Sequence, residues 1–453
     1  MSPIRNWSQW AWLALALGAP VALSGPALGE ITKITVTSSS DIGLFRGKSY
    51  REVQVKMEGK APGGAYSVPV VLTFPIGATD YNGFAVVDVV NTIAVADPKW
   101  VSGGRVFPVA RAHMGDDYLF GNGNFYVGVL WDKKAAEFLH TGAIVTPSDG
   151  YEILRDAARL ARNPAGAHIP LDFALPRAAD WVLAYGYSQS ASLLRDWYFR
   201  HLNTQNGSPA FDGALIGAAG GNCMELKDQG DASWAVCDGA LSDGGKVIAI
   251  NTESDAEWTG FVERGETSDY RAIEIAGVSH IPVAIADFRK FGLPGQNPVD
   301  AFSVFRAALT NLQDWLRGTE PPPSIYITLK EGPAGSLLDA PYKEAVRDAD
   351  GNALGGLRLP HMPSEPVGDK MVGAPLGSYG GLDMSFKDTN TYFLTSGTFS
   401  AFSPERVHEL YPSHDTYVSA VSLAAKGLAA NRYILQEDAD AYVEAAARST
   451  VGQ

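Results

Sequence analysis

A serine between small residues is the feature of this sequence that could most directly do chemistry. Residues Gly186–Ser190 have the sequence GYSQS, follow an apolar run at Trp181–Tyr185 and precede a helix-like run at Ala191–Trp197. A strand, a tight turn and a helix in this order expose a serine hydroxyl, and small residues two before and two after the serine let strand and helix approach closely. The N-terminus of the helix points at the reaction centre. We therefore predict that Ser188 is a nucleophile.

A serine hydroxyl is a poor nucleophile at neutral pH, so it needs a base within hydrogen-bond reach and a carboxylate that orients the base. His280 is the predicted base, because it follows a strand-like run at Tyr270–Ile275 and a glycine turn at Gly277. The chain has eight histidines, and none of the other seven combines this pattern with the right chain order. His414 is kept as the alternative.

The acid is expected after the strand that precedes the histidine. Lys246–Asn251 is that strand-like run, and Glu253 and Asp255 follow it. Asp255 fits the usual offset from the strand slightly better, whereas Glu253 is longer and nearer to the strand end, so both stay as alternatives. Whichever of the two carboxylates is not the acid is expected to accept hydrogen bonds from nearby backbone or to cap the following turn. Asp88 precedes the serine, and the chain order argues against it.

Two backbone N–H groups are needed to stabilise the oxyanion that forms when a serine attacks a carbonyl. One is expected from Gln189, directly after the serine. The other is expected from Asn91 or Thr92, in the loop after a strand-like run. Aromatic residues near these motifs are expected to line a substrate pocket, with a place in the hydrophobic core as the alternative for each tryptophan. The residues are Tyr187, Trp258 and Trp131.

Strand-like and helix-like runs alternate through the first two thirds of the chain. The N-terminal part is rich in strands, and Phe84–Val90 has the unbroken apolar character of a buried central strand. The alternation predicts an α/β fold, with a mostly parallel central sheet and helices on both faces. Further strands are predicted at 125–131, 181–185, 214–217, 246–251 and 270–275, and helices at 151–162, 191–202 and 301–318.

The two ends of the chain differ from this core. Residues 1–29 have the features of a secretory signal peptide, with Arg5 before an apolar run and small residues at the expected cleavage position. We therefore expect a secreted or periplasmic protein, with a retained N-terminal anchor as the alternative. An α/β core is expected over residues 30–323. A Gly- and Pro-rich C-terminal extension over 324–453, which ends in two predicted helices, is a candidate cap over the site.

Composition and charge exclude several classes of partner. The 453-residue chain has 46% hydrophobic residues and a formal net charge of −14, which argues against nucleic acid or anionic lipid. Its two cysteines, Cys223 and Cys237, are expected to form a disulfide in an exported protein. Without nearby histidines or further cysteines they make a poor zinc site, and no metal or cofactor is expected. No segment after the predicted signal approaches the length of a membrane span.

In these motifs the chain resembles the α/β-hydrolase superfamily, and more narrowly the bacterial family often labelled alpha/beta hydrolase domain-containing protein. Ser190 stands where the common pattern has a second glycine, and a serine is small enough for the turn. The resemblance implies the α/β-hydrolase fold and a hydrolase, and it implies little about the substrate. The similar stretches are 186–190, 251–255, 277–280, 350–360 and 410–414.

Together these residues predict a serine hydrolase that cleaves small-molecule or polymeric carboxylic esters through an acyl-enzyme intermediate. The same triad would serve a peptidase, an amidase or a lactonase, so these remain alternatives. A non-catalytic binding protein on a hydrolase fold is a further alternative, which the complete set of serine, acid and histidine disfavours. Dehalogenases and epoxide hydrolases use an aspartate at the turn, so Ser188 argues against both.

Overall fold

The structure is a computed structural model of the chain. The predicted signal, residues 1–29, lies outside the described residues. Those described are 30–92, 109–164, 176–239, 241, 243–281, 297–299, 301–332, 337, 341–360, 366–367, 370–371, 374–387 and 391–453.

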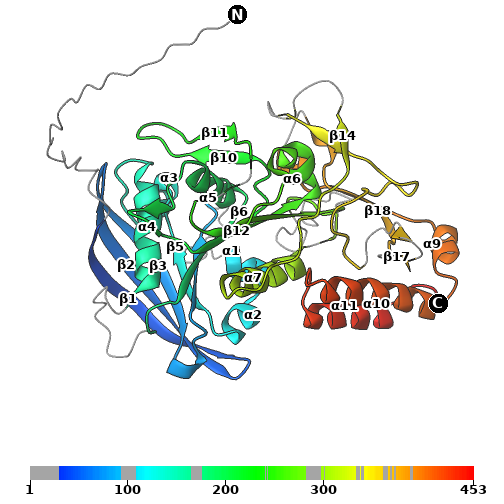
Figure 1. Ribbon diagram of the computed structural model, residues 1–453, viewed down its shortest axis with the longest axis horizontal. Coiled ribbons are helices and arrows are strands. Elements are labelled where there is room, and N and C mark those ends of the chain that lie inside the picture. Colours follow the sequence, from blue (N-terminus) through cyan, green and yellow to red (C-terminus); the bar gives the residue numbers. More distant parts are fainter. Residues whose placement is uncertain are drawn as a thin grey trace, which may run out of the picture.

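A nine-stranded sheet forms the centre of the molecule (Figure 1). In order across the sheet, the strands are β1 (Glu30–Phe45), β2 (Lys48–Ala61), β3 (Gly64–Pro75), β5 (Phe125–Val129), β4 (Phe84–Val89), β6 (Trp181–Tyr187), β9 (Gly213–Gly217), β12 (Lys246–Thr252) and β13 (Tyr270–Ile275). Neighbours from β1 to β5 are antiparallel, and those from β5 to β13 are parallel. The carboxyl ends of the parallel strands therefore meet at one edge, where open α/β sheets bind ligands.

Helices pack on both faces of this sheet, because successive side chains of a strand point to opposite faces. On β4, Ala85, Val87 and Val89 belong to one hydrophobic cluster, whereas Phe84 and Val86 belong to another. The first cluster includes residues of α4 and α5, and the second includes residues of α1, α2 and α7. The helices are α1 (Val109–Met114), α2 (Asp116–Gly121), α3 (Lys133–Leu139), α4 (Asp149–Arg162), α5 (Gln189–Phe199), α6 (Glu253–Trp258) and α7 (Phe302–Leu316).

The predicted α/β fold is confirmed, and the predicted parallel strands end within two residues of their observed ends. The alternation of strand-like and helix-like runs did not predict two elements that follow the carboxyl ends of parallel strands. These are the helix α6, after β12, and a hairpin between β9 and β12. The hairpin strands are β10 (Asn222–Glu225) and β11 (Ser233–Val236), and other short elements are β7 (Thr204–Gln205), β8 (Ser208–Pro209) and the single-turn helices at Ala78–Asp80 and Gly260–Glu263.

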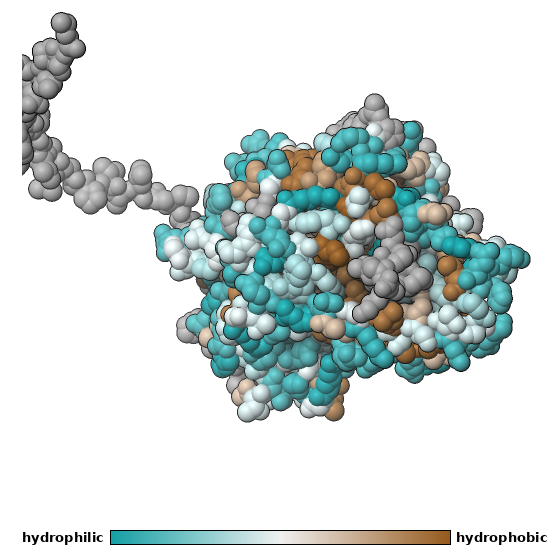
Figure 2. Space-filling view, turned by 45° about the vertical axis from the view of Figure 1, so that its right-hand side comes forward, coloured by the Kyte–Doolittle hydropathy of each residue, from teal (hydrophilic) through white to brown (hydrophobic). Residues whose placement is uncertain are grey.

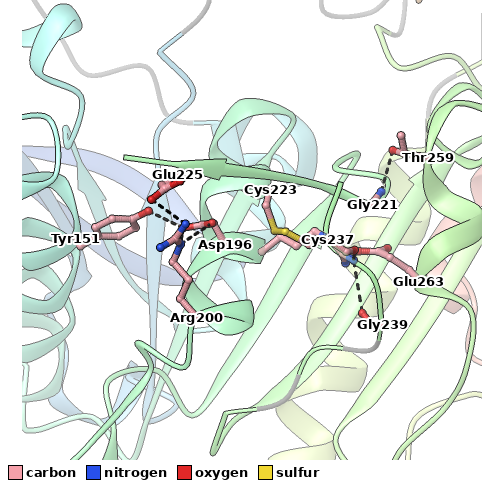
Figure 3. Close-up of a disulfide and its surroundings, with 11 residues drawn as sticks. Tyr151, Asp196, Arg200, Gly221, Cys223, Glu225, Cys237, Gly239, Thr259 and Glu263 are labelled. Atoms are coloured by element: carbon pink, nitrogen blue, oxygen red, sulfur yellow. Dashed lines mark hydrogen bonds and ion pairs between the residues drawn. A yellow bond between two sulfur atoms is a disulfide. The ribbon is translucent and has the colours of Figure 1, made fainter. Parts of the chain in front are cut away.

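The predicted disulfide is confirmed. Cys223 of β10 is bonded to Cys237, which directly follows β11, and their Cα atoms are 5.8 Å apart (Figure 3). The guanidinium of Arg195, on α5, donates a hydrogen bond to the carbonyl of Cys237 and pairs with the carboxylate of Glu263. Both of these charged side chains are fully buried. The disulfide therefore joins the two ends of the hairpin, and Arg195 bonds the hairpin to the helix that follows Ser188.

The region after residue 323 continues the core. Ile325 and Leu357 form parallel bridges with Ile273 and Ile275 of β13, so two further segments extend the sheet beyond its last strand. The helices α10 and α11 lie side by side at the opposite end of the molecule from β1 (Figure 1). The elements are β14 (Leu329–Glu331), β15 (Lys343–Ala345), β16 (Pro366–Val367), β17 (Lys370–Met371), β18 (Gly377–Gly380), the turn Met384–Phe386, α8 (Thr391–Leu394), β19 (Thr398–Ala401), α9 (Pro404–Leu410), α10 (His414–Ala430) and α11 (Gln436–Arg448).

The face shown in Figure 2 is mostly hydrophilic, and its hydrophobic residues gather in separate patches. This agrees with the acidic composition, which keeps a surface well hydrated. Within the residues that the structure describes, no helix combines the length and the apolar character needed to cross a lipid bilayer.

Candidate active site

Ser188 stands at the turn between β6 and α5, with a backbone φ of 57° and ψ of −116°. Positive φ is uncommon for a residue with a side chain, and such strain is often found at active sites. A Cβ on Gly186 would lie 2.8 Å from the backbone carbonyl of Ser190, so strand and helix can approach this closely only with glycine. The buried Ser190 hydroxyl accepts a hydrogen bond from the Tyr187 N–H at 3.0 Å. The second small residue therefore also fixes the turn.

The predicted nucleophile and base are in contact. Ser188 Oγ lies 2.7 Å from His280 Nε2, and His280 Nδ1 lies 2.7 Å from Asp255 Oδ1. A carboxylate only accepts hydrogen bonds, so Nδ1 donates to Asp255 and Nε2 is left to accept from the serine hydroxyl. The alternative base, His414, is bonded through Nδ1 to the carbonyl of Val451 near the C-terminus.

Asp255 is oriented by the start of α6. Thr252 is the N-cap residue of this helix, and its N–H and hydroxyl donate to Asp255 Oδ2 at 3.0 and 2.6 Å. The Thr252 N–H bond, together with the Asp255 N–H that donates to Thr252 Oγ1 at 3.4 Å, forms a capping box. Thr252 therefore occupies one carboxylate oxygen of Asp255 and leaves the other for His280. The spacing Thr-x-x-Asp after a strand is visible in the sequence, and it is the signal that distinguishes Asp255 from its neighbour.

Glu253, the alternative acid, has other partners. Its carboxylate accepts hydrogen bonds from the backbone N–H groups of Gly277 and Gly381, at 2.5 and 3.0 Å. It also pairs with the guanidinium of Arg347 at 2.8 Å. The geometry therefore favours Asp255 over Glu253 as the partner of His280. Arg347 was missed by sequence reasoning because a lone arginine, more than 90 residues after its partner, carries no local signal.

The predicted oxyanion donors lie beside the turn. Gln189 is the first residue of α5, and its side-chain oxygen accepts hydrogen bonds from the N–H and hydroxyl of Thr92 at 3.1 and 2.9 Å. The side chain of Asn91 donates to the carbonyl of Tyr187 at 2.8 Å. The loop after β4 is therefore hydrogen-bonded to the residues before and after Ser188. Because the Thr92 N–H already has a protein acceptor, the second donor stays a prediction.

The chain also matches a known protein family. The family model described as Alpha/beta hydrolase domain matches residues 47–444. The chain belongs to this family. The match begins before the parallel strands and ends inside α11, so it includes both the core and the C-terminal extension. No curated protein matches the chain.

Solved structures similar to this alpha/beta hydrolase include three bacterial proteins. A structure assigned as a dienelactone hydrolase, from Klebsiella pneumoniae, is 10% identical, with a TM-score of 0.33, and the match covers 63% of this chain and 100% of that one. A structure assigned as a hydrolase, from Agrobacterium vitis, is 9% identical, with a TM-score of 0.31 and coverage of 52% and 95%. A glucuronoyl esterase from Teredinibacter turnerae is 12% identical, with a TM-score of 0.25 and coverage of 42% and 46%.

The three aromatic residues predicted to line a pocket have different surroundings in the hydrolase. Trp131 is fully buried, and its indole N–H donates to the carbonyl of Val90 at 2.9 Å, which favours the core alternative. Tyr187 is also buried, and its hydroxyl donates to the carbonyl of His280 at 2.5 Å. The indole nitrogen of Trp258 is buried without a hydrogen-bond partner among the described residues. A pocket role for Trp258 stays a prediction.

A buried histidine that the sequence did not single out lies next to Tyr187. The ring of His113 is 4.2 Å from the ring of Tyr187, and its Nδ1 is hydrogen-bonded to the hydroxyl of Tyr185. Burial, together with the nearby His280, lowers the pKa of His113 to about 3, so it is neutral at physiological pH. No group of three or more side chains suited to a metal ion occurs in the described part of the hydrolase.

Proposed function

We propose that this protein is a serine hydrolase that cleaves carboxylic esters, with Ser188 as nucleophile, His280 as general base and Asp255 as the orienting acid. The observation that carries the proposal is the pair of 2.7 Å contacts from the serine hydroxyl through the imidazole to the carboxylate. They start from a strained turn that exposes the serine at the active edge of the sheet. The family assignment supports hydrolysis as the class of reaction.

In the proposed reaction, Ser188 Oγ attacks the acyl carbon of the ester while its proton passes to His280 Nε2. Asp255 stabilises the imidazolium that forms, because its carboxylate accepts the Nδ1–H bond. The oxyanion of the tetrahedral intermediate is stabilised by the N–H of Gln189, with Asn91 or Thr92 as the second donor. The imidazolium then protonates the leaving alcohol as the C–O bond breaks, which gives the acyl-enzyme. A water molecule activated by His280 hydrolyses the acyl-enzyme and releases the acid.

We also propose that the hydrolase acts outside the cytoplasm, with residues 1–29 as a signal peptide. The disulfide between Cys223 and Cys237 supports this location, because such bonds persist in oxidising compartments. The substrate is then an ester that is present in the periplasm or in the surroundings of the cell.

The test of the mechanism is covalent labelling with a fluorophosphonate probe. The wild type should be labelled at Ser188, and Ser188→Ala should not be labelled, while both proteins have the same melting temperature. Equal labelling of the two proteins would remove the proposed nucleophile.

The class of bond is tested with a panel of chromogenic substrates. We expect hydrolysis of p-nitrophenyl esters, and the dependence of kcat/KM on acyl length separates a small-acyl esterase from a lipase. A higher kcat/KM on peptide p-nitroanilides would instead favour a peptidase, and a higher kcat/KM on lactones would favour a lactonase.

A further inference from the structure

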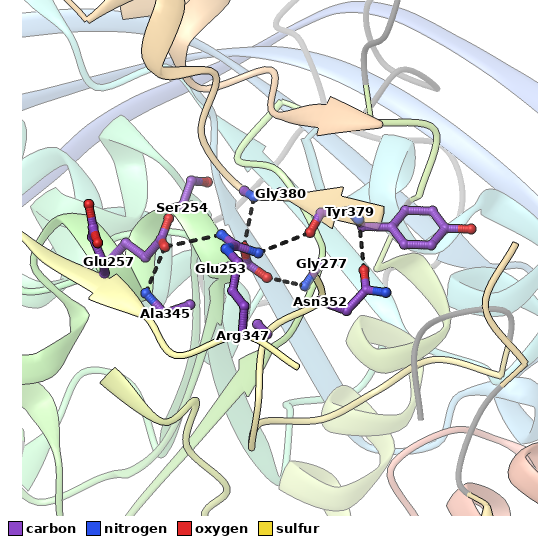
Figure 4. A network of polar contacts seen from close by, with 12 residues as sticks. Glu253, Ser254, Glu257, Gly277, Ala345, Arg347, Asn352, Tyr379 and Gly380 are labelled. Carbon is purple, nitrogen blue, oxygen red and sulfur yellow. Dashed lines mark hydrogen bonds and ion pairs between the residues drawn. The ribbon is translucent and has the colours of Figure 1, made fainter. Parts of the chain in front are cut away.

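The short helix α6 carries three carboxylates at every second position, and only one of them faces the histidine. Asp255 is bonded to His280, whereas Glu253 and Glu257 both face the C-terminal extension. The guanidinium of Arg347 lies between these two, with Nη2 2.8 Å from Glu253 and 3.4 Å from Glu257 (Figure 4). The extension is therefore bound to the same helix that supplies the proposed acid.

Glu253 also holds the turn that carries the histidine. Its Oε2 accepts the N–H of Gly277, and its own N–H donates to the carbonyl of Val278 at 3.0 Å. Gly277 has a φ of 64°, a left-handed conformation that favours glycine. From the far side, the amide of Asn297 donates to the Gly277 carbonyl at 2.7 Å. Both the N–H and the carbonyl of Gly277 are therefore hydrogen-bonded, which fixes the turn that leads to His280.

The buried carboxylate of Glu253 has its charged partner in the extension. The residue is completely buried, so its carboxylate needs partners that replace water. Arg347 supplies a charged partner, and the N–H of Gly381 supplies a hydrogen bond at 3.0 Å to the same oxygen, Oε1. A Cβ on Gly381 would lie 2.4 Å from the backbone nitrogen of Ser254, so the extension packs directly against the start of α6.

We propose that Glu253 is a positioning residue through which the C-terminal extension sets the distance between the proposed acid and base. Glu253 is on the helix of Asp255 and bonds the turn of His280, so one carboxylate links the two elements that carry the partners. Arg347 and Gly381 hold that carboxylate from the extension. The role rests on the proposed serine hydrolase mechanism and goes beyond it, because it makes the extension part of the catalytic geometry.

The substitution Glu253→Gln tests this role. A glutamine side chain has one acceptor oxygen, and its NH2 group would face the N–H of either Gly277 or Gly381. We expect kcat on a p-nitrophenyl ester to fall by about 10²-fold while KM changes by less than about twofold, because a small misplacement of reacting groups affects the chemical step. An unchanged kcat in folded Glu253→Gln would overturn the role.

Glu257→Gln is the matched control. Glu257 lies on the same helix, is also buried and also binds Arg347, but it accepts from Ala345 of the extension and does not contact the histidine turn. Burial, together with Glu253, raises the pKa of Glu257, so a neutral amide is a close mimic of its protonated form. We expect Glu257→Gln to keep kcat within about twofold of the wild type. Equal losses of kcat in both variants would overturn the specific role of Glu253.

A second pair of variants covers the case in which Glu253→Gln does not fold. Arg347→Ala should lower kcat with little change in KM, and millimolar guanidinium should restore part of it, because the Arg347 side chain is 33% exposed and a small cation can reach its place. The loss of kcat should be smaller in Arg347→Lys than in Arg347→Ala. A wild-type kcat in folded Arg347→Ala, or no response of its lowered kcat to guanidinium, would contradict the role.

Fluorophosphonate labelling of the wild type distinguishes failure of the proposed function from failure of the positioning role alone. If the wild type is not labelled at Ser188, the proposed function fails. If it is labelled and the Glu253 and Arg347 variants keep the wild-type kcat, only the positioning role fails.

Discussion

At the scale of residues, two neighbouring carboxylates have different partners because of their positions at the start of one helix. Asp255 is the third residue of α6 and is turned back to Thr252 by the capping box, which directs its free oxygen at His280. Glu253 is the first residue of the same helix and lies closer to the turn at Gly277. The two carboxylates are similar in residue type and in their distance from the end of the preceding strand, and the geometry of the helix distinguishes them.

The substitution Asp255→Asn should lower kcat on a p-nitrophenyl ester by about 10⁴-fold. His280 and Thr252 donate three hydrogen bonds to this carboxylate, and an amide has a single acceptor oxygen, so the imidazole tautomer that can accept the serine proton is no longer favoured. The measurement is kcat with active sites titrated by the fluorophosphonate probe. A larger loss of kcat in Glu253→Gln than in Asp255→Asn would instead assign Glu253 as the acid.

The buried His113 should make stability depend on pH. Its pKa is lowered from 6.5 to about 3 by burial, so below pH 6.5 the unfolded chain binds a proton that the folded protein does not. Its contribution to the free energy of unfolding is therefore complete above pH 6.5 and is lost as the pH falls. Each pH unit below 6.5 lowers the free energy of unfolding by about 1.36 kcal/mol, so the loss is about 2 kcal/mol at pH 5.

The variant His113→Asn isolates this contribution, because it removes the titrating ring and keeps an oxygen or nitrogen near the Tyr185 hydroxyl. The difference in unfolding free energy between wild type and variant, measured by urea denaturation, should shrink by about 2 kcal/mol between pH 7.5 and pH 5. A difference that stays constant over this range would show that His113 titrates alike in both states.

At the scale of elements, the turn at Ser188 depends on close packing between β6 and α5. We expect Gly186→Ala to lower the free energy of unfolding by about 1–3 kcal/mol, because the added Cβ would lie 2.8 Å from the Ser190 backbone and must push strand and helix apart. The shift moves Ser188 away from His280, so kcat should fall as well. Thermal unfolding and ester hydrolysis measure the two effects.

Gly427→Ala is the matched control for this prediction. Gly427 lies within α10, and a Cβ there would meet nothing within 4 Å. The substitution should be neutral or should stabilise the protein by up to about 1 kcal/mol, because alanine favours a helix more than glycine does. Equal effects of the two substitutions would contradict a steric role for Gly186.

The elements with a strong period were predictable from the sequence, and those that depend on distant contacts were not. β4 was recognisable because five of its six residues are apolar, and the structure shows all six of them buried. The helix α6 has only six residues, too few to show a period, although its capping residues Thr252 and Asp255 are visible. The serine and histidine of the candidate site were predictable from local pattern and chain order. Arg347 and His113 reach the site through tertiary packing alone.

At the scale of the whole molecule, the C-terminal extension was expected as a possible cap, and the structure shows that two of its segments continue the sheet. Ile325 and Leu357 continue β13 through backbone bridges. Asp438 of α11 pairs with Arg306 of α7, on one face of the sheet. A cap contributes to selectivity and can often be removed, whereas segments that continue the sheet contribute to folding.

A chain that ends at residue 323 should therefore not fold. It would expose the edge of β13, and the buried Glu253 would lose the charge of Arg347 and the N–H of Gly381. Unpaired sheet edges favour aggregation, and the start of α6 would lose the contacts that hold it from the extension. We expect the truncated protein to be insoluble, or soluble without the cooperative thermal unfolding of the full chain, and to lack fluorophosphonate labelling. A soluble, labelled protein with unchanged activity and selectivity would show that the extension is neither a cap nor a part of the folding unit.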